Sequence, residues 1–167
     1  MTISRRNLLV LACLSWVALP ATAKPHLIPP FTADPTVQKE AEKLDVEARA
    51  LAKSLHTNLD GSEASIHALE SLLDQLCHKG EKGQLSKVTL KKYGRTFGFY
   101  WGQVYCRHHH GTWGTVEMGG EKVPAILYSD DRANDTLHPC LWTENRLLYG
   151  DDWDMAEHYF ELLKPSI

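Results

Sequence analysis

The sequence predicts an α+β domain with a helical N-terminal half and a small antiparallel sheet in its C-terminal half. Two observations lead to this fold class. Hydrophobic residues recur every three or four positions up to residue 109, which is the period of an amphipathic helix. After Gly111, two strand-like runs flank the connection Gly119-Gly120-Glu121-Lys122, which is typical of a hairpin. We therefore expect three N-terminal helices, a β-hairpin, and one or two C-terminal helices.

Residues 1–23 predict an export signal. A pair of arginines precedes an apolar run from Leu8 to Leu19, and Ala21-Thr22-Ala23 has the small-x-small pattern of a cleavage site. The run is shorter than the roughly 20 apolar residues that a membrane span needs. The segment Ser4–Leu9 resembles a twin-arginine signal, and the general secretory route is the alternative. Lipoprotein processing at Cys13 is a third, minor hypothesis. Each route predicts export, and we expect a periplasmic protein.

The mature chain is expected to comprise a proline-rich leader, 24–35, and one α+β domain, 36–167. The domain is long enough to bury a substantial core and too short for two typical domains. The chain has 18 Lys and Arg residues against 21 Asp and Glu residues, with no basic stripe interleaved with aromatic residues. This balance argues against a nucleic-acid partner.

Two amphipathic helices are predicted before residue 81. Pro35 suits the first turn of the first helix, and Ser62 is a candidate cap for the second. The break between the helices falls at residues 58–61, and Lys79-Gly80 is expected to end the second. The expected buried positions are Val37, Ala41, Leu44, Ala48, Leu51 and Leu55 in the first helix, and Ile66, Leu69, Leu73 and Leu76 in the second.

A third helix is predicted from Ser86 to His109, and it should be the central one. Four aromatic residues recur at every fourth position beside three glycines with the same spacing, so the helix should present an aromatic ridge and a glycine groove. Each glycine costs about 0.8–1 kcal/mol relative to alanine in a helix, so another backbone is expected to approach the groove closely. The residues are Tyr93, Phe97, Trp101 and Tyr105, and Gly94, Gly98 and Gly102.

The remaining chain predicts a hairpin followed by helices. Its strands are 112–118 and 123–128, and Pro124 places the second strand at an edge or at its own beginning. A charged turn is expected from Ser129 to Thr136. Pro139 can open a short helix that ends at Gly150. Asp154 and Glu157 have capping-box spacing for a last helix, whose apolar face is expected to contain Trp153, Ala156, Phe160 and Leu163.

A metal site is one functional hypothesis. Cys106, His110, His138 and Cys140 have the side chains that bind zinc or copper, and the first two are one helical turn apart. The spacing matches no established motif. A structural explanation also exists, because Arg and His complement the dipole at a helix C-terminus and Gly111 is a helix stop. Two of the three mature cysteines (Cys77, Cys106, Cys140) could pair in the periplasm, and the sequence does not select which.

Catalytic motifs are missing from the sequence. It contains no nucleophile elbow, zinc-protease motif or phosphate loop. Cys106 near several histidines has the residue types of a cysteine nucleophile, so a small hydrolase is the third functional hypothesis. The acidic pair at 130–131 is explained by a solvated turn, and the three aspartates within 151–154 are explained by a helix start. We therefore expect a non-enzymatic protein with no cofactor.

Protein binding is the leading hypothesis. The junction from His108 to Trp113 joins a predicted helix to a predicted strand, which is a usual place for binding residues. Arg107, His109 and Trp113 are the expected anchors for a partner protein, because arginine and tryptophan are enriched in interface hot spots.

Two segments carry a resemblance to known proteins. Phe97–Val104, read as FGFYWGQV, and Gly111–Gly114 together resemble a group of small bacterial domains. The group shares an F-G-x-Y-x-G-x-V helix, a G-x-W strand start and a final helix, and some members are similar to immunity proteins that neutralise secreted toxins. The resemblance implies the fold and a toxin as partner. This chain departs from the pattern at Gln103, where an acidic residue is more usual, and in its run of three histidines.

Overall fold

A computed structural model describes residues 30–128 and 136–164 of the protein. Within these residues it contains five α-helices and a four-stranded antiparallel sheet, which confirms the predicted α+β class. The predicted signal peptide, the leader up to residue 29 and most of the charged turn lie outside the described residues. None of the helices in the described ranges combines the length and the apolar character needed to cross a membrane.

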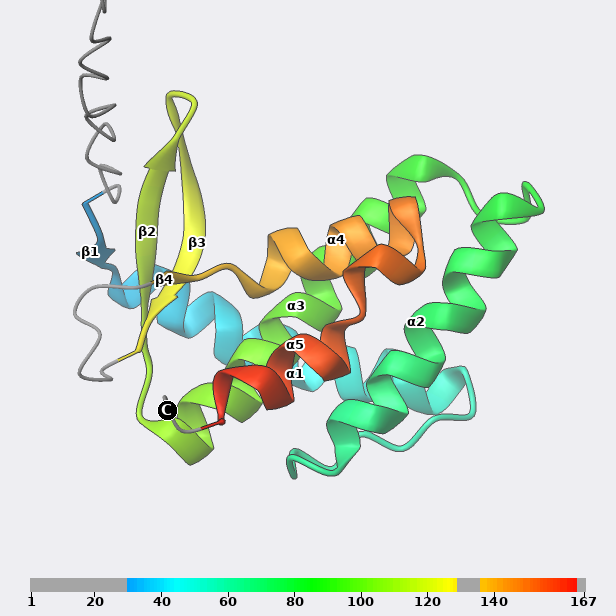
Figure 1. Ribbon diagram of the computed structural model, residues 1–167, viewed down its shortest axis with the longest axis horizontal. Coiled ribbons are helices and arrows are strands. Elements are labelled where there is room, and N and C mark those ends of the chain that lie inside the picture. The colour runs from blue at the N-terminus through cyan, green and yellow to red at the C-terminus, as the bar shows by residue number, and fades with distance from the viewer. Residues whose placement is uncertain (1–29, 129–135, 165–167) are drawn as a thin grey trace, which may run out of the picture.

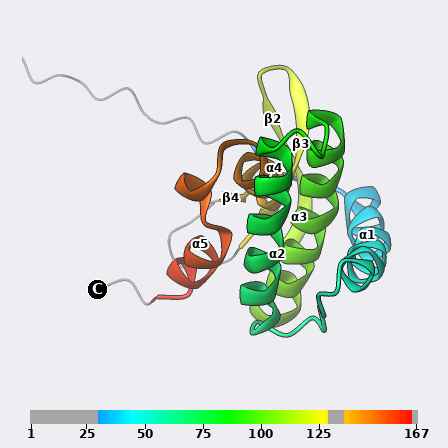
Figure 2. The same cartoon turned by 90° about the vertical axis from the view of Figure 1, so that its right-hand side faces the viewer.

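The N-terminal half consists of three helices, with α3 in the middle. They are α1 (Pro35–Ser54), α2 (Ser65–Glu81) and α3 (Lys87–His109). Figures 1 and 2 show α1 and α2 on different sides of α3. The stripe predicted for α2 is buried. In α1 the buried face is formed by Val37, Ala41, Ala48 and Ala52, whereas the predicted positions Leu44, Leu51 and Leu55 are only partly buried. The predicted hydrophobic periods therefore identify the faces that form the core.

Local capping explains where the helices begin. Pro35 occupies the first turn of α1, and the Asp34 carboxylate accepts a hydrogen bond from the Thr36 backbone N–H at 2.9 Å. Ser86 caps α3 by accepting from the Thr89 N–H at 3.1 Å. The start of α2 differs from the prediction. Its first helical residue is Ser65, because residues 62–64 form a separate turn in which the Ser62 hydroxyl accepts from the Ser65 N–H at 3.3 Å.

The sheet is built on the predicted hairpin. Strands β2 (Thr112–Met118) and β3 (Glu121–Leu127) pair antiparallel, and two short strands, β1 (Thr32–Ala33) and β4 (Thr136–Leu137), flank them in the order β1-β2-β3-β4. The flanking strands were not predicted, because two residues are too few to show a period. Strand β3 begins two residues earlier than predicted and lies inside the sheet, which corrects the expectation that Pro124 marks an edge strand or a strand beginning. Pro124 lies opposite Thr115, outside the part of β3 that pairs with β4, where its missing N–H removes no hydrogen bond to β4.

The glycine groove of α3 receives α4 (Pro139–Tyr149), as Figure 1 shows. A Cβ atom at Gly94 would lie 2.7 Å from Glu144 Cα, and one at Gly98 would overlap Cys140 Cα. At Gly102 the neighbour is the ring of Trp113. The predicted close approach is confirmed, and its main partner is a helix backbone.

The C-terminal helices follow the predicted boundaries. Helix α4 ends at Gly150, and a short 3-10 turn, η1 (Asp151–Trp153), leads to α5 (Met155–Leu162). The Asp154 carboxylate accepts from the Glu157 N–H at 2.7 Å, as the capping box predicts. The buried face of α5 differs from the prediction. Met155 and Tyr159 are fully buried, whereas Trp153, Phe160 and Leu163 are only partly buried.

Candidate functional site

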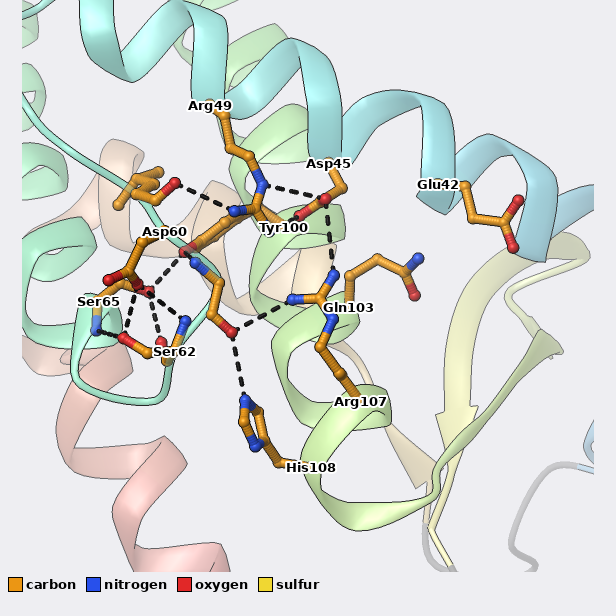
Figure 3. Close-up of polar contacts among 12 residues, drawn as sticks. Glu42, Asp45, Arg49, Asp60, Ser62, Ser65, Tyr100, Gln103, Arg107 and His108 are labelled. Atoms are coloured by element: carbon orange, nitrogen blue, oxygen red, sulfur yellow. Dashed lines mark hydrogen bonds and ion pairs between the residues drawn. The ribbon is translucent and has the colours of Figure 1, made fainter.

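The C-terminal end of α3 lies against the loop between α1 and α2, residues 55–64. Arg107 Nη1 and His108 Nε2 both donate to the Gly61 carbonyl, each at 3.2 Å, as Figure 3 shows. The Gly61 N–H donates in turn to the Tyr100 hydroxyl at 3.0 Å. We call Asp45, Arg49, Gly61, Tyr100, Arg107 and His108 the Gly61 cluster. It links two exposed side chains of α3 to one backbone carbonyl.

An ion pair between Asp45 and Arg49 on α1 is part of the Gly61 cluster. The Arg49 guanidinium donates to both oxygens of Asp45, each at 3.1 Å, which is the expected contact for positions four apart on a helix. The same guanidinium donates to the Leu59 carbonyl at 3.3 Å and lies 5.2 Å above the Tyr100 ring. Asp45 also faces Arg107 Nη2 at 3.7 Å. The pair therefore connects α1 to both the loop and α3.

Gly61 has to be a glycine. Its φ of +84° lies in the left-handed region, and a Cβ atom there would come 2.5 Å from Arg107 Nη1. The loop is fixed on its inner side as well, since Leu59 is buried. Any side chain at position 61 would displace Arg107 from the carbonyl that it binds.

The base of the Gly61 cluster is buried and polar. Tyr100 has no exposed surface, and its hydroxyl lies 2.5 Å from the Ser65 hydroxyl. The Ser65 hydroxyl donates in turn to the Ser62 carbonyl at 2.5 Å, so the hydroxyls of both Tyr100 and Ser65 have hydrogen-bond partners. Burial raises the pKa of Tyr100, so the phenol stays neutral and serves as a hydrogen-bonding group. Its position indicates that it holds the loop in place.

A second contact joins α3 and α5 to the loop between α1 and α2, at Glu63. His109 Nε2 lies 2.7 Å from Glu63 Oε1, and the Tyr159 hydroxyl donates to the same oxygen at 2.9 Å. The hydrogen bond with His109 is the main reason why the pKa of Glu63 lies below its ordinary value. Glu63 therefore connects the end of α3 to α5.

The predicted partner anchors have different environments. The Arg107 side chain is 45% exposed and that of His109 is 29% exposed. Trp113 is buried, at 2% exposure, and its indole N–H donates to Gln103 Oε1 at 3.0 Å. Trp113 is therefore a core residue, because the glycine at position 102 leaves room for its ring, and this corrects its prediction as an anchor. Sequence reasoning included His108 in the junction expected to bind a partner, but not among the anchors. It missed Gly61, for which the only signal was a glycine in a loop.

The four predicted metal ligands are not gathered. Cys140 is buried in the glycine groove beside Gly98, and Cys106 lies about 12 Å further along α3 at 1.5 Å per residue. His138 precedes α4 and lies 3.2 Å from the Thr136 hydroxyl, and His110 is the exposed left-handed cap of α3. Across residues 30–128 and 136–164, no three His, Cys, Asp or Glu side chains form a group that could hold a metal ion.

The thiols have environments that disfavour nucleophilic chemistry. Cys77, Cys106 and Cys140 are unpaired. Burial raises the pKa of the Cys106 thiol to about 12, and it also raises the pKa of Cys140. A thiol is reactive as its thiolate, which these surroundings destabilise. In this structure Cys106 therefore lacks the surroundings that activate a thiol nucleophile.

Comparison with known proteins gives no match to a family model, to a curated protein or to a solved structure.

Proposed function

We propose that this protein is an exported protein-binding domain that recognises its partner with the end of α3, and that it acts as an immunity protein against a secreted toxin. One observation carries the proposal. Arg107 and His108 are both exposed, yet both are held by the same carbonyl of a loop that is fixed from inside. The toxin class comes from the resemblance of Phe97–Val104 and Gly111–Gly114 to immunity proteins.

A fixed and exposed arginine is well suited to protein recognition. A guanidinium carries five N–H donors, and the Gly61 carbonyl takes one of them. The Asp45 carboxylate faces another nitrogen at 3.7 Å, which leaves donors on the exposed side for a partner. Because the side chain is already ordered, binding loses less conformational entropy. Arginine is also among the residues that dominate binding energy at interfaces.

The test uses the exported chain and the product of the neighbouring gene as the candidate toxin. We expect the wild-type protein to bind this product and to protect cells that produce it. The double variant Arg107→Ala/His108→Ala should bind at least about 30-fold more weakly, which corresponds to the loss of one interface hot spot. It should also fail to protect.

The matched control is His78→Ala/Lys82→Ala, which removes one imidazole and one cation at the far end of α2. Both variants are first checked for unchanged secondary structure and thermal unfolding. A folded Arg107→Ala/His108→Ala variant that binds and protects like the wild type would overturn the proposed surface. Absence of any complex with the wild type would count against the immunity function itself.

A further inference from the structure

A groove of about 640 Å³ lies between the first half of α2 and helix α5. Figure 2 shows α5 on the side of α2 that is away from α1, so the groove is separate from the Gly61 cluster. Its volume is in the range of ligand sites, about 300–1,000 Å³. Its lining combines four carboxylates with two aromatic rings and one cation, namely Glu70, Asp154, Glu157, Glu161, His67, Phe160 and Lys164.

The aromatic wall of the groove is held from two sides. The Phe160 ring stacks on His67 with their centroids 4.7 Å apart and 19° between the planes. It also packs edge-on against Tyr159 at 5.2 Å. Tyr159 is fully buried and bound to Glu63, so α5 cannot easily shift the ring. Phe160 is a fixed, partly exposed aromatic surface beside carboxylates.

Two of the four carboxylates have structural roles and two are available. The Asp154 carboxylate caps α5 by accepting from the Glu157 N–H at 2.7 Å. Both oxygens of Glu70 are used, by Arg146 Nε at 2.5 Å and by the Met155 N–H at 2.9 Å. Within the described residues, Glu161 forms an ion pair with Lys164 at 3.7 Å, and its charge also acts on His158. For the Glu157 carboxylate, the described residues provide no hydrogen bond or ion pair. Glu157 and Glu161 are one turn apart, where two like charges are unfavourable unless a cation lies between them.

We propose that this groove binds an arginine side chain presented by the partner protein. The guanidinium is held by Glu157 and Glu161, and its planar face lies on Phe160. Paired carboxylates accept the forked donors of arginine, and an aromatic face attracts the same cation. The inference rests on the proposed function and deepens it by specifying the charge of one partner segment.

The groove is connected to the proposed partner surface by a continuous series of contacts. His109 at the end of α3 contacts Glu63, which accepts from Tyr159, whose ring packs on Phe160. A partner seated on Arg107 and His108 can therefore reach the groove along α5. Lys164 is the internal competitor for Glu161, and an incoming guanidinium would displace it.

The experiment titrates the exported chain with an acetylated and amidated glycine peptide that contains two arginines. Binding is followed by amide chemical shifts. We expect shifts confined to α5 and the first half of α2, and binding that weakens with added salt. Glu157→Gln/Glu161→Gln should weaken binding about fivefold, and Phe160→Leu about threefold. Lys164→Gln should tighten it about twofold.

The control variant is Glu42→Gln/Glu47→Gln, which removes the same two charges from α1 and should bind like the wild type. A glutamate peptide should not bind, and a lysine peptide should bind more weakly. Equal binding of the lysine peptide, absence of shifts in α5, or unchanged binding by Glu157→Gln/Glu161→Gln would each overturn the inference. The peptide does not require Arg107, so binding to the Arg107→Ala/His108→Ala variant separates failure of the groove from failure of the proposed function.

Discussion

The two parts of α3 make their tertiary contacts in different ways. Between Gly94 and Gly102, every fourth residue of α3 is a glycine. The backbone of α4 and the ring of Trp113 therefore approach the backbone of α3 directly. At the C-terminal end of α3, the side chains of Arg107 and His108 donate hydrogen bonds to the carbonyl of Gly61 in the loop between α1 and α2. The first contact excludes water and tolerates no added atoms. The second leaves charged groups partly exposed and available.

This difference separates stability from recognition within one helix. A backbone-to-backbone contact is lost when one methyl group is added, because a packed core has no free volume. A surface hydrogen bond from a long side chain contributes little to folding, but it orders that side chain for binding. We therefore expect substitutions in the groove to unfold the protein, and substitutions at the end of α3 to leave it folded.

The largest loss of stability is expected at Arg146, through which α4 contacts α2. This residue is 4% exposed and bonds Glu70 at 2.5 Å and Asp74 at 3.1 Å. Arg146→Met should destabilise the protein by about 3–5 kcal/mol in urea unfolding, because it leaves Glu70 without its counter-charge. Lys43→Met, which breaks an exposed pair, should change stability by less than about 0.5 kcal/mol. Equal effects would show that α4 does not depend on this ion pair.

The second-largest loss of stability is expected from a substitution in the glycine groove of α3. Gly98→Leu places a side chain where the Cys140 backbone lies. The overlap should cost about 1–3 kcal/mol or more in urea unfolding, which exceeds the gain in helix propensity of about 0.8–1 kcal/mol.

The matched pair for this test is Gly98→Ala and Gly80→Ala. At Gly80 the added methyl would meet only the end of the Leu90 side chain, which can move. Gly80→Ala should therefore be close to neutral while Gly98→Ala destabilises. If Gly98→Leu is as stable as the wild type, the groove does not hold α4 and faces solvent or a partner.

Tyr100→Phe tests a residue that belongs to the glycine-rich segment of α3 and contacts the loop between α1 and α2. Losing the hydroxyl leaves the buried Gly61 N–H without its acceptor, which should cost about 1–2 kcal/mol in thermal or urea unfolding. It should also weaken partner binding, since the loop that orders Arg107 becomes looser. Tyr149→Phe is the control, because Tyr149 is 69% exposed. Unchanged stability would mean that Gly61 is held by its carbonyl contacts alone.

The smallest effect is a dependence of stability on pH at α5. His158 stacks on Trp142 at 3.6 Å, and burial lowers the pKa of His158 below its ordinary value of 6.5, with Glu161 opposing the shift. The unfolded chain therefore binds the proton more readily than the folded one, and stability falls as the pH drops through 6.5 toward the folded pKa.

Urea unfolding at pH 7.5 and pH 5.5 measures this effect. His158→Phe keeps the stacking and should reduce the loss of stability between the two pH values. Some loss should persist, because burial also lowers the pKa of His138. His67→Phe, at an exposed ring, should leave the wild-type loss in place. Identical losses in wild type and His158→Phe would exclude His158 as the group responsible.

Much of the architecture follows from the sequence because its causes are local. Three predicted features each depend on a residue and its near neighbours: the cap of α3 at Ser86, the cap of α5 at Asp154 and the end of α4 at Gly150. The hairpin turn is shorter than the predicted four residues, because Glu121 and Lys122 pair with β2 as part of β3. The glycine stripe also predicted a close backbone approach. Its partner, α4, could not be identified, since any element of the chain could have filled the groove.

The candidate site was predictable only in part. Arg107 and His109 were identified by their place at a helix end, and both do contact the loop between α1 and α2. Trp113 was placed on the surface because tryptophan is common in interfaces, but the space beside Gly102 buries it. The acidic groove was missed, because residues from α2 and α5 are far apart in the sequence.

By itself, the sequence determined the α+β class, the ends of α3 and α4, and the buried face of α2, because periodicity and caps act over a few residues. Only the tertiary structure decided that α4 fills the glycine groove, that Gly61 collects Arg107 and His108, and that Glu63 joins α3 to α5. These contacts connect residues up to 96 positions apart. Such pairings depend on which surfaces fit together, and no local pattern encodes that fit.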